Sequence, residues 1–160
     1  MNTTDYALEI VPGKQEIVGS RLFDAPRELV FKTMTDPTLI PRWWGPRRHA
    51  TRVDEMEVRA GGRWRYVLRD PDGDETAFHG VYHDLTAPER LIYTFEWEGQ
   101  PGHVLLETVT LEDVGGQTKM TDLLVFQSVA DRDGMVENGM ESGARETMDR
   151  LEELLTGGAS

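Results

Sequence analysis

The segment RWRYVLRDPDG, residues 63–73, decides the fold because it contains a half-buried strand and the tight turn that ends it. Trp64, Tyr66 and Leu68 alternate with arginines, which is typical of a strand with one apolar and one solvated face. The Asp-Pro-Asp-Gly sequence at 70–73 predicts a hairpin turn. The segment therefore predicts an antiparallel sheet that must bury one of its faces.

Similar short segments lie on both sides of this hairpin and are separated by glycine- and proline-containing turns. We expect strands at about 15–23, 52–58, 63–69, 75–86, 90–98, 103–113 and 118–126. Proline-containing signals at 24–26 and 36–37 predict two short helices after the first strand. A helical repeat of apolar residues over 132–155 predicts one long C-terminal helix, the element best able to cover the sheet.

These elements predict an α+β protein in which a curved antiparallel sheet wraps around the C-terminal helix. Its order is strand, two short helices, six strands and the long helix. We expect a flexible N-terminal arm at 1–14, a single domain at 15–156 and a C-terminal tail at 157–160. The length of 160 residues fits one core.

Composition excludes several classes of function. A net charge of −12 argues against nucleic acid and against an anionic membrane surface as partners. The absence of cysteine excludes disulfides, thiolate metal sites and thiol nucleophiles. No secretory signal and no apolar run long enough to cross a membrane is present, so we expect a cytoplasmic protein. We expect no cofactor and no metal, and a homodimer is left open.

An ordered set of segments resembles the START-like, or Bet-v-1-like (SRPBCC), superfamily. They are most similar to the branch named for the C-terminal domain of the ATPase activator of the ninety-kilodalton heat-shock chaperone. The similarity covers nearly the whole chain from residue 16 onward. The segments that carry it are Phe23–Phe31, Pro41–Pro46, Gly62–Tyr66, Asp70–Gly73, His79–Tyr82, Pro88–Tyr93, Gly139–Glu141 and Arg150–Leu155.

The resemblance implies the helix-grip fold and an apolar or amphipathic ligand held between sheet and helix. It also implies a link to stress response, and some superfamily members are aromatase/cyclases of polyketide pathways. The eukaryotic co-chaperone has an additional N-terminal domain that this sequence lacks, so the resemblance does not carry chaperone activation over to this chain.

The residues themselves indicate where a cavity would lie. Aromatic side chains repeat at period two on three strands and can converge on one wall, which suits a hydrophobic or aromatic small molecule. A tryptophan pair and two glycines of the last helix complete the expected lining. The predicted cavity residues are Trp43, Trp44, Trp64, Tyr66, Phe78, Tyr82, Tyr93, Phe95, Trp97, Gly139 and Gly143.

Each of these features also has a structural interpretation. The aromatic residues can form a filled core, since protein interiors are close-packed. Trp43 and Trp44 can both plug one end of that core, or one can border the cavity while the other packs inward. Gly139 and Gly143 either allow the helix to approach the sheet closely or leave room for a ligand.

Chemistry-bearing residues give a weaker signal. His79 and His83 lie too far apart on a strand to share one zinc ion, although a single histidine in the cavity remains open as an acid–base group. Glu107 and Asp122 interrupt apolar strands, so one of them is expected to point inward. A basic cluster near the tryptophans can meet an acidic head group or pair with surface carboxylates; it comprises Arg42, Arg47, Arg48 and Arg52.

The sequence therefore favours a non-catalytic protein that binds a small apolar or amphipathic molecule in a cavity between sheet and helix. Two alternatives remain. One is an enzyme of the cyclase or hydrolase type that uses the same cavity, although no catalytic residue is assigned. The other is a chaperone-associated interaction protein that acts through its outer surface.

Overall fold

A single antiparallel sheet of eight strands forms the body of the protein. The computed structural model describes residues 5–157. Along the sheet the strands follow the order β1-β2-β8-β7-β6-β5-β4-β3. Their bounds are β1 (Ala7–Ile10), β2 (Glu16–Phe23), β3 (Ala50–Met56), β4 (Arg63–Arg69), β5 (Glu75–Thr86), β6 (Arg90–Trp97), β7 (Val104–Val114) and β8 (Gln117–Val125).

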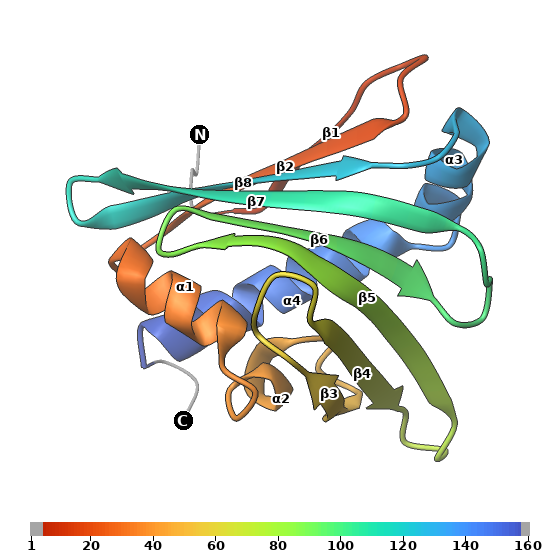
Figure 1. The fold of residues 1–160 in the computed structure, drawn as a ribbon, viewed down its shortest axis with the longest axis horizontal. Helices are drawn as coiled ribbons and strands as arrows, with labels where there is room; N and C mark the ends of the chain where they lie inside the picture. Colours follow the sequence, from red (N-terminus) through yellow and green to blue (C-terminus); the bar gives the residue numbers. More distant parts are fainter. Residues whose placement is uncertain (1–4, 158–160) are drawn as a thin grey trace.

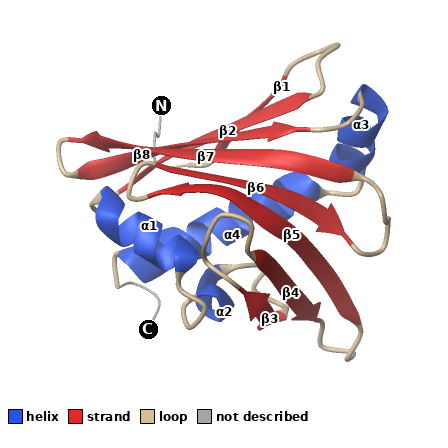
Figure 2. Ribbon diagram, in the orientation of Figure 1, coloured by secondary structure: helices blue, strands red, loops and turns tan. Residues whose placement is uncertain are grey.

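Within the described residues four helices accompany the sheet, and α1, α2 and α4 lie on the same side of it (Figure 2). The longest, α4, crosses the curved sheet, with α1 near one of its ends and α3 near the other (Figure 1). The bounds are α1 (Arg27–Thr35), α2 (Ile40–Trp43), α3 (Val129–Glu137) and α4 (Met140–Leu155). The α+β helix-grip architecture expected from the sequence is therefore confirmed.

Alternating side chains place the core between the sheet and α4. In β2 every second residue is buried, from Ile17 to Phe23, and β8 shows the same pattern. Leu151 of α4 is fully buried and belongs to the same core cluster as Phe23 of β2 and Met120 of β8. The buried Arg21 of β2 donates to Asp149 of α4 at 2.6 Å and adds a polar tie between the two layers.

The C-terminal helix is two helices, which corrects the expectation of one continuous helix over 132–155. Gly139 has a φ of +81°, a left-handed conformation that favours glycine, and it separates α3 from α4. The backbone N–H groups of Asn138 and Gly139 close the end of α3 on the carbonyls of Gly134 and Val136. The apolar repeat continues across this break, so periodicity alone does not reveal it.

The N-terminal segment also differs from the expected flexible arm at 1–14. Ala7–Ile10 forms the edge strand β1, which pairs with β2 through Ala7↔Ser20 to Ile10↔Ile17. Tyr6, just before it, is 4% exposed. Long-range pairing therefore orders this short segment. Residues 1–4 of the arm and 158–160 of the predicted tail lie outside the described residues.

Gly80 of β5 is a position where the fold requires the absence of a side chain. It pairs with Trp64, whose indole Nε1 donates to the carbonyl of Thr94 at 3.2 Å across it. A Cβ at Gly80 would lie 1.8 Å from that carbonyl oxygen and 2.6 Å from Trp64 Nε1.

We expect Gly80→Ala to destabilise the protein by about 1–3 kcal/mol, because the clash involves backbone and forces the strands apart. Urea denaturation measures this loss, and the slope of the unfolding free energy against urea concentration should equal that of the wild type. Gly134→Ala is the control, since nothing lies within 4 Å of the Cβ it would carry in α3. That variant should equal the wild type or gain up to about 1 kcal/mol. Equal destabilisation of both variants would contradict the role assigned to Gly80.

Candidate functional site

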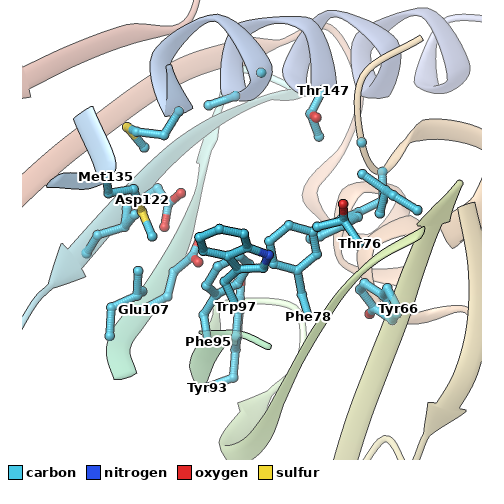
Figure 3. Close-up of a pocket in the computed structure, with 18 of the residues that line it drawn as sticks. Tyr66, Thr76, Phe78, Tyr93, Phe95, Trp97, Glu107, Asp122, Met135 and Thr147 are labelled. Atoms are coloured by element: carbon cyan, nitrogen blue, oxygen red, sulfur yellow. The ribbon is translucent and has the colours of Figure 1, made fainter. Parts of the chain in front are cut away.

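A cavity of about 810 Å³ lies between the sheet and the helices α3 and α4. Figure 3 shows aromatic side chains of β4, β5 and β6 on one side of it and Thr147 of α4 on the other. Small residues on the helix side, among them Gly143 and Ala144, face these large rings. The cavity therefore results from a mismatch in side-chain bulk between the two layers.

All eleven residues proposed from the sequence line this cavity. Their role in holding a ligand stays a prediction. They come from α2 and its C-cap, from three neighbouring strands and from the start of α4: Trp43, Trp44, Trp64, Tyr66, Phe78, Tyr82, Tyr93, Phe95, Trp97, Gly139 and Gly143.

The paired tryptophans face different surroundings. Trp43 is 3% exposed, and its indole Nε1 donates to the carbonyl of Thr33 at 3.2 Å, so it packs into the core. Trp44 is only partly buried and stands edge-on to Tyr66 and Phe78, with ring centroids 4.9 and 5.4 Å away. Both side chains contact the cavity, Trp43 from within the core and Trp44 from a more open position beside the aromatic wall.

The two glycines also differ from each other. Gly139 forms the break between α3 and α4. Gly143 lies inside α4, and a Cβ there would meet no atom within 4 Å. Gly143 therefore leaves open space instead of allowing close contact with the sheet.

Two carboxyl groups enter the cavity side by side, where the sequence predicted one. Glu107 of β7 pairs with Leu124 of β8, and Asp122 of β8 pairs with Val109 of β7. Glu107 and Asp122 are therefore diagonal neighbours on the same face of the sheet. Both line the cavity, and Figure 3 shows them together at one end of it. The signal was present in the sequence, because each alternates with buried apolar residues along its strand.

Tyrosines flank the carboxyl pair on both sides. Tyr93 of β6 stands opposite Glu107. On the other side Tyr6 extends across Gly19, where a Cβ would lie 2.1 Å from the phenol oxygen. The Tyr6 hydroxyl donates to Asp122 Oδ2 at 3.4 Å. No sequence signal pointed to Tyr6, since its place depends on the pairing of β1 with β2.

The surroundings favour protonation of the pair. Burial raises the pKa of Asp122 well above its ordinary value, and the charge of Glu107 and a hydrogen bond to it raise that pKa further. Burial also raises the pKa of Glu107, while hydrogen bonds from Asp122 and Tyr93 oppose that rise. The pKa of each carboxyl therefore depends on the protonation of the other, and burial raises both.

Neither His79 nor His83 lines the cavity. His79 points to the outer face, where its Nδ1 lies 2.8 Å from Glu98 Oε2, and His83 is exposed. Glu98 also accepts hydrogen bonds from Arg65, which together with His79 lower its pKa to about 2. The cavity instead contacts His49 and His103.

Two arginines of the basic cluster pair with surface carboxylates. Arg47 contacts Glu153, and Arg52 donates to Asp54 and Glu75. None of the four arginines of this cluster lines the cavity. Within residues 5–157 no three His, Cys, Asp or Glu side chains gather in a way that could hold a metal ion. In the same range no helix is long and apolar enough to cross a membrane.

We expect Asp122→Asn to stabilise the protein above neutral pH. The folded state raises the pKa of Asp122, so it holds this proton more tightly than the unfolded chain does. The resulting stability is complete below the unfolded pKa of about 4 and is lost as pH rises through the raised folded value. Because asparagine has no such proton, the variant should be more stable than the wild type at pH 8, and this difference should disappear as the pH falls to about 4.

Urea denaturation between pH 4 and 9 measures this difference. Glu112→Gln is the control, because Glu112 is an exposed carboxylate of β7. Its pH profile should follow that of the wild type. An Asp122→Asn profile parallel to the wild-type profile would show that the pair does not titrate as described.

Comparisons with known proteins identify the family. The family described as Activator of Hsp90 ATPase homolog 1-like protein matches residues 24–156. A search of curated proteins gives no match.

Solved structures share the fold over almost the whole chain. A protein of Arthrobacter aurescens is 27% identical, with a TM-score of 0.88 over 94% of this chain and 91% of its own. A protein of Rhodobacter sphaeroides is 24% identical, with a TM-score of 0.87 over 96% and 99%. DynU16, a protein of the dynemicin biosynthetic locus, is 18% identical, with a TM-score of 0.71 over 91% of this chain and 49% of its own. The chain therefore belongs to the family of Activator of Hsp90 ATPase homolog 1-like proteins, within the START-like (SRPBCC) superfamily.

Proposed function

We propose that the chain binds a small apolar or amphipathic molecule in the cavity between the sheet and α4. The observation that carries this proposal is the volume of about 810 Å³ together with its aromatic lining. Ligand pockets in proteins typically measure about 300–1,000 Å³ and are lined mainly by apolar and aromatic side chains with a few polar groups. This cavity has that size and that composition.

The aromatic wall supplies the contact area that such a ligand needs. Trp44, Phe78 and Phe95 form one group of rings, with Phe78 and Phe95 5.2 Å apart between centroids. Phe78, Phe95 and Trp97 are only partly buried although they stand on the inner face of the sheet. Their accessible surface faces the cavity, so a bound apolar molecule would remove it from water.

The position of Gly143 allows a direct test. It lies one helical turn before Thr147, which points into the cavity, and open space surrounds its missing side chain. Gly143→Leu should fill part of the cavity. Leucine is also a better helix former than glycine by up to about 1 kcal/mol, so the helix should not weaken.

We expect Gly143→Leu to lower the affinity for prodan, an uncharged naphthalene dye that brightens in apolar surroundings, by about tenfold or more. Ser142→Leu is the matched control, because its exposed side chain faces away from the cavity; its affinity should stay within about twofold of the wild type. Fluorescence titration gives the affinity, and urea denaturation checks the fold. Equal binding by all three proteins, or no binding by the wild type, would contradict the proposal.

A second candidate function has one specific observation in its favour. A protonated carboxyl beside a carboxylate can act as general acid and base, and Glu107 and Asp122 form such a pair inside the cavity. This favours a cyclase or hydrolase reaction on a bound aromatic substrate. Turnover that Asp122→Asn abolishes while binding persists would support it. The chaperone-associated role is supported by the family name alone, and an ATPase assay with purified chaperone tests it.

A further inference from the structure

The polar end of the cavity contains acidic groups in surroundings that should exclude them. Glu107 and Asp122 stand on adjacent strands among Leu105, Val109 and Leu124, all of which line the same cavity. Burying a carboxylate among apolar side chains costs free energy unless a partner compensates its charge. Among the described residues that line the cavity, none is a lysine or arginine that could compensate this charge.

Asp122 has an oxygen without a donor. Asp122 is 7% exposed, and its Oδ2 accepts the hydrogen bond from the Tyr6 hydroxyl. The other oxygen, Oδ1, is buried and receives no hydrogen bond from a donor group among residues 5–157. Glu107 is the charged group that raises the pKa of Asp122 most strongly after burial, so the pair carries a negative charge whenever one of its two carboxyls is ionised.

The protein supplies no cation to balance this charge. No lysine or arginine is among the described residues that line the cavity. Arg21 of β2 is engaged with Asp149, and Arg145 of α4 is engaged with the carbonyl of Tyr6 and with Glu141. Both guanidinium groups are therefore held outside the cavity by other partners.

The aromatic wall beside the pair favours positive charge as well. In Figure 3 the carboxyl groups of Glu107 and Asp122 face the same space as Phe95 and Trp97. The face of an aromatic ring carries partial negative charge and attracts an ammonium group within about 6 Å, and this attraction grows when water is excluded. The carboxyl pair and the aromatic rings therefore both favour a ligand that carries a positive charge.

We propose that the cavity selects amphiphilic amines, with the protonated nitrogen placed between Glu107 and Asp122 and the apolar part against the aromatic wall. This rests on the proposed function, since it names the class of ligand for the same cavity. The ammonium group donates to Asp122 Oδ1 and to Glu107, and it balances the remaining charge of the pair.

Other ligand classes fit the same site less well. A carboxylate or phosphate ligand would meet the carboxyl pair with like charge and no balancing arginine or lysine. A neutral ligand would leave the negative charge of the pair without a counter-ion. A bare metal ion would find only two carboxyl ligands, because the described residues provide no third acidic, histidine or cysteine side chain beside them.

A matched series of three probes tests the inference: 4-phenylbutylamine, 4-phenylbutanol and 4-phenylbutanoic acid. They share a phenyl ring on a four-carbon chain and differ at the end carbon of that chain, which carries an amine, a hydroxyl or, as the carboxyl carbon, an acid. All four tryptophans of the chain line the cavity, so quenching or shift of their fluorescence reports binding, and calorimetry confirms the stoichiometry. At pH 7.5 we expect the amine to bind about tenfold or more tightly than the alcohol, and the acid to bind most weakly.

The variant Glu107→Gln/Asp122→Asn should remove this preference. It keeps the shape of both side chains, so the alcohol should bind within about threefold of its wild-type affinity while the amine loses its advantage. Glu112→Gln, on the outer face of β7, should behave as the wild type. If the wild type binds amine and alcohol equally, the amine inference fails and the proposed function stands. If none of the probes, prodan included, binds the folded protein, both fail.

Discussion

The structure depends on a single constraint: one helix must cover the concave face of an eight-stranded sheet. The sheet presents tryptophan, tyrosine and phenylalanine from β4, β5 and β6. The facing part of α4 carries Gly143, Ala144 and Thr147 between Met140 and Met148, and these three small residues leave space in front of those rings. Toward its C-terminus the same helix carries Leu151, which is fully buried. Packing is therefore complete at one end of α4 and incomplete at the other, and this difference in bulk both anchors the helix and leaves the cavity.

The carboxyl pair is the second departure from an ordinary core. A close-packed apolar interior would be more stable without Glu107 and Asp122, because burial disfavours their charged forms. Local features that reduce stability without a structural gain commonly mark functional sites. Here the two departures coincide, because both buried carboxyl groups line the open space on the inner face of the sheet. Shape and electrostatics thus support the same functional proposal independently.

Much of the fold could be predicted from the sequence, because strong alternation and tight turns determine it locally. The strands expected at 63–69 and 75–86 have those bounds in β4 and β5, and the other strands of the meander differ by one or two residues. The break at Gly139 was missed because the apolar repeat passes through it. Strand β1 was missed because its order comes from pairing with β2, a contact that no local pattern encodes. The aromatic lining followed from period-two spacing. The register of β7 against β8 places both carboxyls on the inner face, and local sequence patterns do not encode this register. The contact between Tyr6 and Asp122 likewise depends on tertiary structure.

The reach of Tyr6 across Gly19 has a further thermodynamic consequence. The phenol that donates to Asp122 stands just before β1, a four-residue edge strand held by one neighbour. Short edge strands separate from a sheet more readily than its central strands do. When β1 separates, water reaches the carboxyl pair and its proton affinity falls toward the ordinary range. Burial raises the pKa of Asp122, whereas the hydrogen bond from Tyr6 lowers it. Protonation and strand attachment are therefore linked equilibria, and because burial is the larger effect, alkaline conditions favour fraying of this edge.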